Sequence, residues 1–377
     1  MEPIFLYGTL CHEPLRQLVV GDHAEPIPAR LPDHTVYWAK AESYPLIVEE
    51  VGGIAEGLLL QESAEQAISR MDYYQGAFGF ALQAVVVRTA EGPVKACMYG
   101  PPKTGVQPGA SWDLRSWVDR WGPLSCMTAE EIMEDMEQRP ASEVARRFGP
   151  LRARAQARLN ARNAKPPITL RHSARAEDIG LERRQLCYAN FFSVEEYDLT
   201  HRRFSGGHGE LLSRTAFVSG DAVTVLPYDP VRDRVLLVEQ FRAGPYARGD
   251  DQPWLLEAIA GRIDGGETPE QAARRESAEE AGLSIHDLRL VSEYYPTPGA
   301  KTEYLFAYLA IADLPDEAAG LGGVEGEGED IRTHVIGFDH AMELLETGEI
   351  NVGPLILLLL YLARSRAELR NAAAEGG

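Results

Sequence analysis

The stretch from Gly261 to Leu283, GRIDGGETPEQAARRESAEEAGL, constrains the fold of this chain more than any other part of it. It carries the signals for both ends of one helix. Thr268 can cap the N-terminus, Pro269 suits the first helical position, and Gly282 suits the left-handed residue that ends a helix. Together these signals predict a helix of about 13 residues.

Three carboxylates of this helix fall on one face. Glu276, Glu279 and Glu280 stand at i, i+3 and i+4. Like charges this close repel, and acids near the C-terminal end of a helix are unfavourable without a compensating cation. Arg274 and Arg275 could supply that charge, in which case the stretch would be an ordinary exposed charged helix. A bound divalent cation is the alternative, because hard cations prefer oxygen ligands.

The spacing of the charged residues favours the metal site. The pattern G-x5-E-x7-R-E-U-x-E-E-x-G-U, in which U is aliphatic, is matched by Gly261, Glu267, Arg275, Glu276, Glu279, Glu280 and Gly282. It resembles the Nudix box of hydrolases that cleave nucleoside diphosphates linked to another moiety. Only Ser277 departs from the pattern, at an aliphatic position beneath the helix.

The Nudix resemblance implies a site for a hard divalent cation, Mg²⁺ or Mn²⁺. Glu267 would orient Arg275 or bind a metal through water, and Arg275 would hold the acidic cluster together. The implied chemistry is attack of water on a phosphoanhydride. The implied metal ligands are the backbone carbonyl of Ala260 and the carboxylates of Glu276, Glu279 and Glu280.

Composition sets further bounds on the function. The chain has 377 residues, which predicts two or three domains. Its formal net charge of −20 argues against nonspecific binding to nucleic acid or to an anionic membrane. We expect no signal peptide and no membrane span, because the apolar runs are too short. We expect reduced thiols in a cytoplasmic protein, because no CxxC motif occurs among Cys11, Cys97, Cys126 and Cys187.

Residues 1–103 are predicted to be β-rich, with short apolar runs at 4–7, 57–60, 84–87 and 95–99 and one helix at about 63–71. The opening FLYGTL, the pair at 44–45 and MDYYQG at 71–76 resemble the gamma-glutamylcyclotransferase fold, a small mixed β-barrel. The alternative for 7–9 is a plain strand followed by a tight turn. The resemblance implies a ligand pocket that includes Tyr7, Gly8, Thr9, Leu10 and Gln75.

One residue departs from the active members of that fold. They carry a glutamate as general acid or base where this chain has Gln75. An amide does not exchange a proton near neutral pH, and a positioned base contributes roughly 10²–10⁴-fold to the rate. We therefore expect this domain to be catalytically impaired or repurposed, for example for binding or dimer contacts.

Residues 104–165 are predicted to form a helical connector, in which Thr128 and Glu131 make a capping box at the start of a second helix. From Arg146 to Lys165 the chain is basic. Because aromatic side chains do not alternate with these charges, we expect a solvated helix or a contact with the acidic domains rather than a nucleic-acid site. The prolines at 166–167 mark a domain boundary.

Residues 166–377 are predicted to form an α/β/α sandwich around the box, so the whole chain is of two-domain α+β and α/β class. Predicted strands cover 220–226, 234–239, 288–295 and 303–310, and a closing helix starts at 351–354. Outside the box this part resembles the ADP-ribose pyrophosphatase subfamily, and its proline marker is Pro298, sixteen residues after Gly282. Its segments LPYDPVRD, EQFR, PWLLEAIAG, TPGAKTE and GEGEDIR carry that resemblance. The two-domain order resembles Nudix fusions associated with tellurite resistance.

The subfamily resemblance implies hydrolysis of ADP-ribose to AMP and ribose 5-phosphate. Phe191 and Arg214 would hold the adenine between a ring and a guanidinium, partly across a homodimer formed by this domain. A plain core aromatic is the alternative for Phe191. Arg242 would bind a phosphate, and Pro298 and Gly299 would also contact substrate.

The catalytic base is expected on the glycine-rich acidic loop at 321–330. Alignment on the following Asp-Ile-Arg selects Glu327, with Glu329 next and Glu303 as an auxiliary; the alternative is a solvated acidic loop.

Three other functions remain open for the chain. They are hydrolysis of other ADP-sugars or NADH, gamma-glutamyl cyclisation by the N-terminal domain, and nonhydrolytic sensing of ADP-ribose, which the intact box glutamates argue against.

Overall fold

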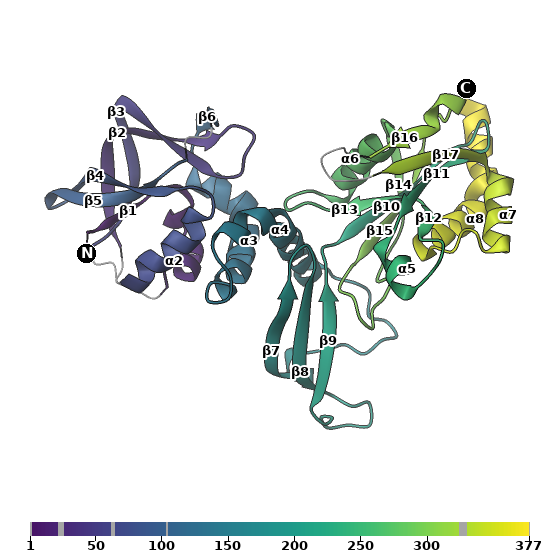
Figure 1. Ribbon diagram of the computed structural model, residues 1–377, viewed down its shortest axis with the longest axis horizontal. Coiled ribbons are helices and arrows are strands. Elements are labelled where there is room, and N and C mark those ends of the chain that lie inside the picture. Colours follow the sequence, from purple (N-terminus) through teal and green to yellow (C-terminus); the bar gives the residue numbers. More distant parts are fainter. Residues whose placement is uncertain (1, 22–25, 62–64, 103–104, 324–329, 377) are drawn as a thin grey trace. The chain divides into compact units, whose positions relative to one another are not determined.

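The computed structural model describes residues 2–21, 26–61, 65–102, 105–323 and 330–376 (Figure 1). The chain divides into two compact units, residues 1–163 and 164–377. Within the described ranges, no helix is both long enough and apolar enough to cross a membrane.

Unit 1 contains a closed mixed barrel. The strand order is β3-β1-β5-β4-β2, and β2 pairs back onto β3. The β1–β5 pair is parallel and the other barrel pairs are antiparallel. The predicted β-barrel is confirmed. Its strands are β1 (Ile4–Leu6), β2 (Ile27–Ala39), β3 (Pro45–Leu60), β4 (Ala81–Thr89) and β5 (Gly92–Gly100), and β6 (Pro108–Ser111) extends the sheet beside β2.

The chain leaves β1 through a tight 3-10 turn, η1 (Gly8–Cys11), and enters α1 (Glu13–Val20). Gly8 has a φ of 63°, and a Cβ there would lie 2.2 Å from Cγ of Pro45. Only glycine therefore lets this turn approach the start of β3. The helices α1 and α2 (Glu65–Gly76) pack on the barrel through a core that includes Leu6, Leu15 and Met71.

Two long helices complete unit 1, α3 (Leu114–Glu134) and α4 (Ser142–Asn163). The carboxylate of Asp113 caps α3 by accepting from the Ser116 N–H at 2.7 Å. The prediction of a new helix start at Thr128 is wrong. Its hydroxyl instead donates to the carbonyl of Leu124 at 2.7 Å, inside the continuous helix α3.

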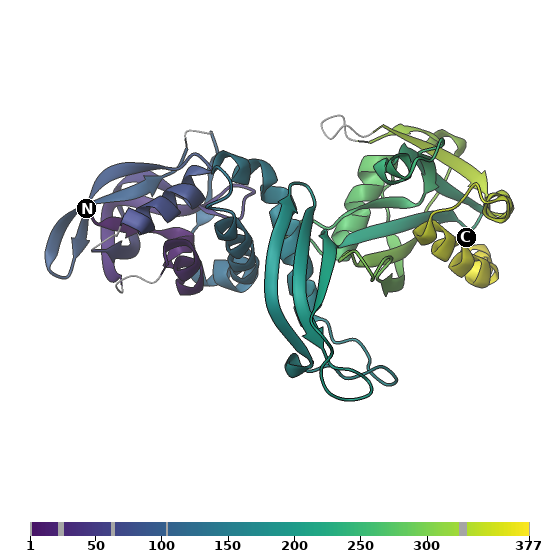
Figure 2. The same ribbon diagram turned by 60° about the horizontal axis from the view of Figure 1, so that its bottom comes forward.

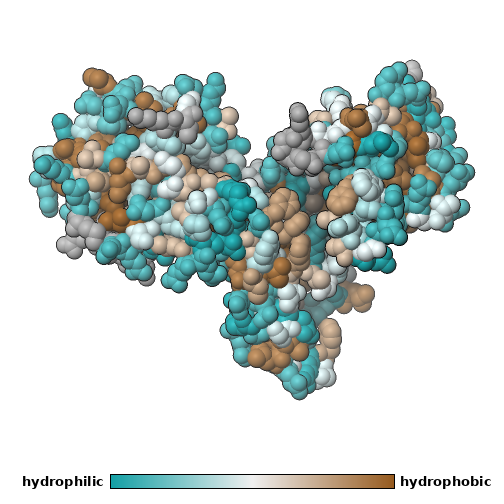
Figure 3. Space-filling model, viewed as in Figure 1, coloured by the Kyte–Doolittle hydropathy of each residue, from teal (hydrophilic) through white to brown (hydrophobic). Residues whose placement is uncertain are grey.

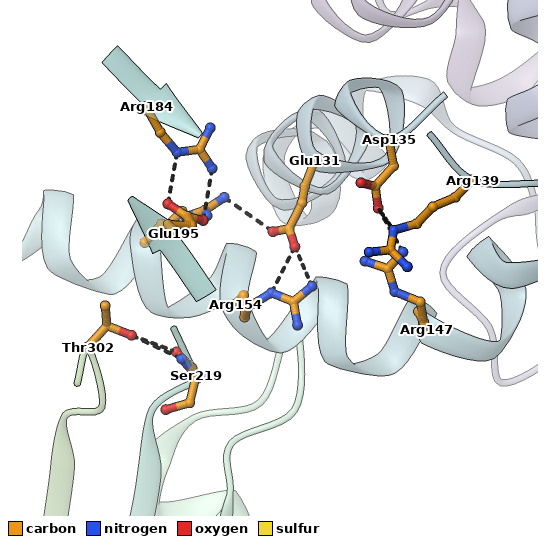
Figure 4. A network of polar contacts seen from close by, with 10 residues as sticks. Glu131, Asp135, Arg139, Arg147, Arg154, Arg184, Glu195, Ser219 and Thr302 are labelled. Atoms are coloured by element: carbon orange, nitrogen blue, oxygen red, sulfur yellow. Dashed lines mark hydrogen bonds and ion pairs between the residues drawn. The ribbon is translucent and has the colours of Figure 1, made fainter. Parts of the chain in front are cut away.

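The basic run of this segment lies largely in α4, where several arginines pair with acidic side chains. Arg154 donates to Glu131 of α3 at 2.8 Å and Arg147 donates to Asp135 at 2.7 Å (Figure 4). Arg158 also donates to Glu131, at 3.2 Å. Arg147 and Arg154 are almost completely buried. Of the two expected alternatives, a solvated helix is therefore wrong for these two residues, whose charges pair with acidic side chains. A guanidinium is buried only with a partner charge, so the pairs fix how α4 lies along α3.

Unit 2 is built on a mixed sheet of eight strands, in the order β14-β15-β10-β11-β17-β16, with β12 beside β11 and β13 beside β10. The β10–β15 pair is parallel and the other pairs are antiparallel. The strands are β10 (Ala222–Asp229), β11 (Arg234–Phe241), β12 (Trp254–Glu257), β13 (Ile259–Arg262), β14 (Asp287–Tyr294), β15 (Leu305–Ile311), β16 (Gly320–Gly322) and β17 (Ile331–Gly337).

Helices cover both faces of this sheet (Figures 1 and 2). Along β10, Val223 and Val225 belong to the core under α6 (Pro269–Ala281), while Leu226 and Tyr228 belong to the core under the other two helices. Those helices are α7 (Phe338–Thr347) and α8 (Gly353–Gly376). The predicted α/β/α sandwich is confirmed. The apolar run of α8 is core, because Leu355, Leu358, Leu359 and Leu362 are fully buried.

A separate antiparallel sheet precedes the sandwich in unit 2. It consists of β7 (Ile179–Ala189), β8 (Ser193–His201) and β9 (Leu212–Val218), and the sequence analysis did not predict it. The Phe217 N–H donates to the carbonyl of Ala300 at 2.8 Å, which ties the end of β9 to the loop before β15. Hydrophobic surface lies over this sheet in Figure 3, and Ile179 and Leu181 of β7 are more than half exposed.

Asp233 fastens α8 to the turn between β10 and β11. Its carboxylate accepts from Nε of Arg366 at 2.9 Å, from the Tyr228 hydroxyl at 2.8 Å and from Arg370 at 2.9 Å. The hydrogen bond from Arg366 lowers the pKa of Asp233, and partial burial only partly opposes it. Because the folded carboxyl has the lower pKa, its stabilising contribution is complete above the unfolded value of about 3.9 and is lost as the pH falls through the folded value.

Asp233→Asn is therefore expected to melt at a lower temperature than the wild type at pH 7. The difference should shrink towards pH 3, as measured by circular dichroism melts at several pH values. Asparagine tolerates the φ of 57° at this position, so the backbone is not the cause. The matched control is Asp339→Asn, because Asp339 also pairs with Arg366 but is mostly exposed. Equal melting of Asp233→Asn and wild type at pH 7 would contradict this account.

Candidate functional site

Helix α6 begins and ends where its sequence signals predict. Thr268 Oγ1 accepts from the Gln271 N–H at 3.2 Å, and Gln271 Oε1 accepts from the Thr268 N–H at 2.9 Å. Gly282 follows in the left-handed conformation, with a φ of 64°. The predicted bounds of the helix are confirmed. This fixed helix sets the positions from which its glutamates project.

Arg275 joins the carboxylates around α6. Its guanidinium donates to both oxygens of Glu267 at 2.8 and 2.9 Å, to Glu276 at 2.7 Å and to Glu279 at 3.0 Å. Hydrogen bonding to Glu267 is the largest cause that raises the pKa of Arg275 above its ordinary value. At Glu267, burial alone would raise the pKa, but the hydrogen bonds from Arg275 and from the Asp264 N–H bring it below its ordinary value.

Strand β13 packs against this cluster. The Ala260 N–H points to Oε2 of Glu280 at 3.4 Å, and Glu280 is only 2% exposed. A Cβ on Gly261 would lie 1.9 Å from Cδ and Oε1 of Glu276. Gly261 is thus the residue that leaves room for the Glu276 carboxylate. The departure at Ser277 is accommodated, because its buried hydroxyl donates to the Ala273 carbonyl at 2.7 Å.

The donors around α6 suit a hard divalent cation, since they are carboxylates and backbone carbonyls. In the ranges that the structure describes, no three His, Cys, Asp or Glu side chains are arranged as a metal-ligand set. At α6 the Arg275 guanidinium binds oxygens of Glu276 and Glu279. A cation at this place would compete with Arg275 for those oxygens.

Phe191 lies between β7 and β8, and its ring is half exposed. The guanidinium carbon of Arg262 lies 3.5 Å from the ring centroid, and the ring of Phe192 packs edge-on at 4.7 Å. The carbonyl of Arg262 accepts from Arg275 at 2.9 Å. Phe191 is therefore connected to the carboxylate cluster through Arg262, which the sequence analysis missed. The available sequence signal was that Arg262 directly follows Gly261.

Phe191 and Arg214 are not brought together within one chain. In the β8–β9 ladder Ser193 pairs with Val218 and Tyr197 pairs with Arg214. Arg214 thus lies four residues further along the sheet from the Phe191 end, about 13 Å at 3.3 Å per residue. Its guanidinium donates to the carbonyl of Ser213 at 2.9 Å.

Arg242 stands at the end of β11, just before α5 (Ala243–Arg248). Its planar fork binds Glu257 of β12, from Nε to Oε1 at 2.9 Å and from the second nitrogen to Oε2 at 2.6 Å. Glu257 is 8% exposed, so this pair is partly shielded from water. No local signal in the sequence points to Glu257, because the pairing depends on the β11–β12 register.

The remaining predicted residues of unit 2 follow α6 in the chain. Pro298 and Gly299 are exposed in a turn that the Lys301 N–H closes by donating to Thr297 at 3.0 Å. Glu303 accepts from Lys301 Nζ at 2.7 Å. Glu327 and Glu329 lie outside the described residues.

A cavity of about 550 Å³ lies in unit 1. Its lining includes four of the five residues predicted for the N-terminal pocket: Tyr7, Thr9, Leu10 and Gln75. The Tyr7 hydroxyl donates to the carbonyl of Tyr99 at 2.9 Å, and burial raises its pKa well above the ordinary value. The fifth residue, Gly8, forms the turn against Pro45 described above.

Comparison with known proteins bears on both units. The family model described as NUDIX domain matches residues 218–355, which hold α6 and most of the sandwich. The ADP-ribose pyrophosphatase of Escherichia coli (strain K12) is 37% identical over 194 residues, which cover 52% of this chain and 92% of that protein. The chain belongs to the Nudix family.

Two further relatives match the same half of this Nudix protein. The ADP-ribose pyrophosphatase of Haemophilus influenzae (strain ATCC 51907 / DSM 11121 / KW20 / Rd) is 34% identical over 198 residues, 52% of this chain and 91% of that protein. The GDP-mannose pyrophosphatase of Salmonella paratyphi A (strain ATCC 9150 / SARB42) is 34% identical over 194 residues, 50% of this chain and 97% of that protein. The protein is therefore a hydrolase that acts on pyrophosphate bonds.

The N-terminal part of the Nudix protein has its own match. The family model described as gamma-glutamyl cyclotransferase, AIG2-like, matches residues 4–118. This range contains the whole barrel and the first residues of α3. The chain is a fusion of a gamma-glutamylcyclotransferase-like domain with a Nudix domain.

Proposed function

We propose that the protein is an ADP-ribose diphosphatase that requires Mg²⁺ or Mn²⁺ and releases AMP and ribose 5-phosphate. The observation that carries the proposal is the continuous set of contacts from Phe191 through Arg262 and Arg275 to Glu276. It links an exposed aromatic ring, suited to stacking on a purine, to carboxylates suited to a metal beside a diphosphate. Two of the relatives are named ADP-ribose pyrophosphatases, which supports this substrate.

The metal would be held by Glu276, Glu279, Glu280 and the carbonyl of Ala260. When bound, such a cation neutralises the diphosphate and lowers the pKa of the attacking water. Arg275 keeps the carboxylates together and is anchored by Glu267. Arg242 would add a phosphate contact, with its fork oriented by Glu257. Glu303 would assist the catalytic base, and Pro298 and Gly299 would contact substrate. We assign this hydrolase domain to residues 166–377, which follow the barrel (1–103) and the helical segment (104–165) in the sequence.

We infer a homodimer formed through the Nudix domain. The exposed apolar side chains of the β7–β9 sheet support it, as does the separation of Phe191 from Arg214 within one chain. A second copy would supply the Arg214 that the first cannot bring to its own Phe191. Multi-angle light scattering on the full chain is expected to give the mass of a dimer.

The four free cysteines agree with a cytoplasmic location.

The test of the function is a hydrolysis panel with the full chain and Mg²⁺ over ADP-ribose, other ADP-sugars, GDP-mannose, NADH and gamma-glutamyl amines. ADP-ribose is expected to give the highest kcat/KM, with AMP and ribose 5-phosphate as products. A higher kcat/KM for GDP-mannose or NADH would move the assignment to another Nudix substrate. Tight ADP-ribose binding without turnover would instead indicate a sensor, and release of 5-oxoproline would indicate an active N-terminal domain.

Phe191→Ala is expected to raise KM for ADP-ribose by about 10-fold or more with a smaller change in kcat, because base stacking on an aromatic ring contributes about 1–3 kcal/mol. Steady-state kinetics with ADP-ribose measure both constants. The control is Phe204→Ala, since Phe204 is almost fully exposed in the β8–β9 loop. An unchanged KM in Phe191→Ala would remove this ring from the substrate site.

The loop glutamates can be ranked by the same assay. Glu327→Gln is expected to lower kcat by about 100-fold, within the range of a positioned general base. The apparent affinity for Mg²⁺ should change little, because the metal ligands are left intact. Glu329→Gln is the matched comparison from the same loop. A larger loss in Glu329→Gln would transfer the role of base to that residue.

A further inference from the structure

The cavity of unit 1 has the properties of a ligand site that phosphoanhydride hydrolysis does not use. Its volume of about 550 Å³ falls within the range of about 300–1,000 Å³ typical of small-molecule sites. Aromatic rings from the barrel, from α2, from α3 and from α4 make up much of its wall. Such a wall favours a ligand with an apolar or flat body.

Two charged side chains line this cavity among the residues that the structure describes, the cation Arg152 and the anion Glu42. The guanidinium carbon of Arg152 lies 5.2 Å from the ring centroid of Trp121 and 5.7 Å from that of Phe148. Tyr74 lines the same cavity; burial raises the pKa of its phenol and the charge of Arg152 lowers it. The planar fork of a guanidinium has a geometry suited to a carboxylate.

The cavity is unsuited to acid-base catalysis at the position of Gln75, whose amide donates and accepts hydrogen bonds but does not exchange a proton near neutral pH. The cation in its wall comes from outside the matched family region. That region ends at residue 118, whereas Phe148 and Arg152 belong to α4. Helix α4 therefore contributes the cation in the wall of this cavity.

We propose that this cavity is a non-catalytic binding site for a small monocarboxylate with an apolar, aromatic body. The carboxylate pairs with the guanidinium of Arg152, and the body lies among the rings of the wall. Gln75 serves as a hydrogen-bonding group at this site. The inference concerns unit 1 alone and goes beyond the hydrolase function proposed for unit 2.

The test uses the full chain and two probes of the same shape, 3-phenylpropanoate and its neutral amide, 3-phenylpropanamide. Isothermal titration calorimetry is expected to show one site that binds the acid at least about 10-fold more tightly than the amide, because the amide lacks the charge-assisted pair. In Arg152→Gln the preference for the acid should disappear. Arg152→Lys keeps the charge and should retain part of the preference. Arg146→Gln, an exposed change on the same helix, should bind the acid as the wild type does.

Equal affinity of the wild type for acid and amide would overturn the proposal, as would the absence of saturable binding of the acid. These two outcomes do not depend on whether any variant folds. Undiminished acid binding by a folded Arg152→Gln would also overturn it, because the carboxylate would then pair elsewhere. Release of 5-oxoproline from gamma-glutamylaniline would show a catalytic cavity and contradict the non-catalytic role. ADP-ribose hydrolysis does not enter the readout, so failure of the proposed function leaves this test intact.

Discussion

Glu280→Gln is expected to lower kcat/KM for ADP-ribose by at least about 1,000-fold, because a metal at a diphosphate contributes several kcal/mol to the barrier. The change removes one charge and keeps the size of the side chain. Glutamine can still accept from the Ala260 N–H, so the contact of α6 with β13 is preserved. The loss should therefore come from weaker metal binding, and the Mg²⁺ concentration needed for half-maximal rate should rise.

Stability should move in the opposite direction to activity. Glu280 is buried one helical turn from Glu276, so neutralising it relieves repulsion between the two carboxylates in the metal-free protein. Glu280→Gln is expected to melt at or above the wild-type temperature in EDTA. The control is Glu270→Gln, an exposed carboxylate in the first turn of the same helix. Wild-type turnover and an unchanged Mg²⁺ requirement in Glu280→Gln would refute the metal-ligand role.

The helix of the box could be predicted to the residue because its signals are local. The capping pair at 268 and 271 and the left-handed Gly282 act within a few residues of one another. Strand β2 was not predicted, because its local signals oppose a strand. It contains Pro28 and Pro32, which argue against a strand in a local reading, yet its long pairing with β3 continues past a bulge after Pro32. Tertiary pairing here outweighs the local preference.

The β7–β9 sheet could not be predicted from alternation. Most side chains of β7 are exposed, so its sequence lacks a regular apolar face. Cross-strand charge pairs hold it instead, with Arg183 donating to Asp198 at 2.6 Å and Arg184 to Glu195 at 2.8 Å (Figure 4 shows the second pair). Such pairs become visible only when the register of the two strands is known.

The candidate site shows the same division between local and long-range information. The glutamates of the box follow from helical spacing, and the structure places Glu276 and Glu280 against β13. The contacts of Arg262 with Phe191 and of Arg242 with Glu257 join segments that are far apart in the chain or depend on strand register. The carboxylates are therefore predictable from the sequence, whereas the groups that orient their neighbours are not.

Gly261→Ala is expected to reduce kcat/KM for ADP-ribose by about 100-fold or more, because a displacement of about 1 Å at a reacting group costs that much. The new Cβ would lie 1.9 Å from the Glu276 carboxylate, which must rotate away. The backbone of Gly261 is not among the positive-φ glycines, so alanine fits its conformation. Since only the end of a flexible side chain is displaced, the free energy of unfolding should change by less than about 1 kcal/mol.

Two variants make this prediction specific to Glu276. Gly244→Ala is the control, because a Cβ there meets open space, and it should leave turnover unchanged. Glu276→Asp shortens the side chain that collides with the new methyl group. Combined with Gly261→Ala, it is expected to cost less activity than the sum of the two single changes, since both act on one carboxylate. Strict additivity in this double-mutant cycle, or a Gly261→Ala protein with full activity, would show that Gly261 does not hold the place of the Glu276 carboxylate.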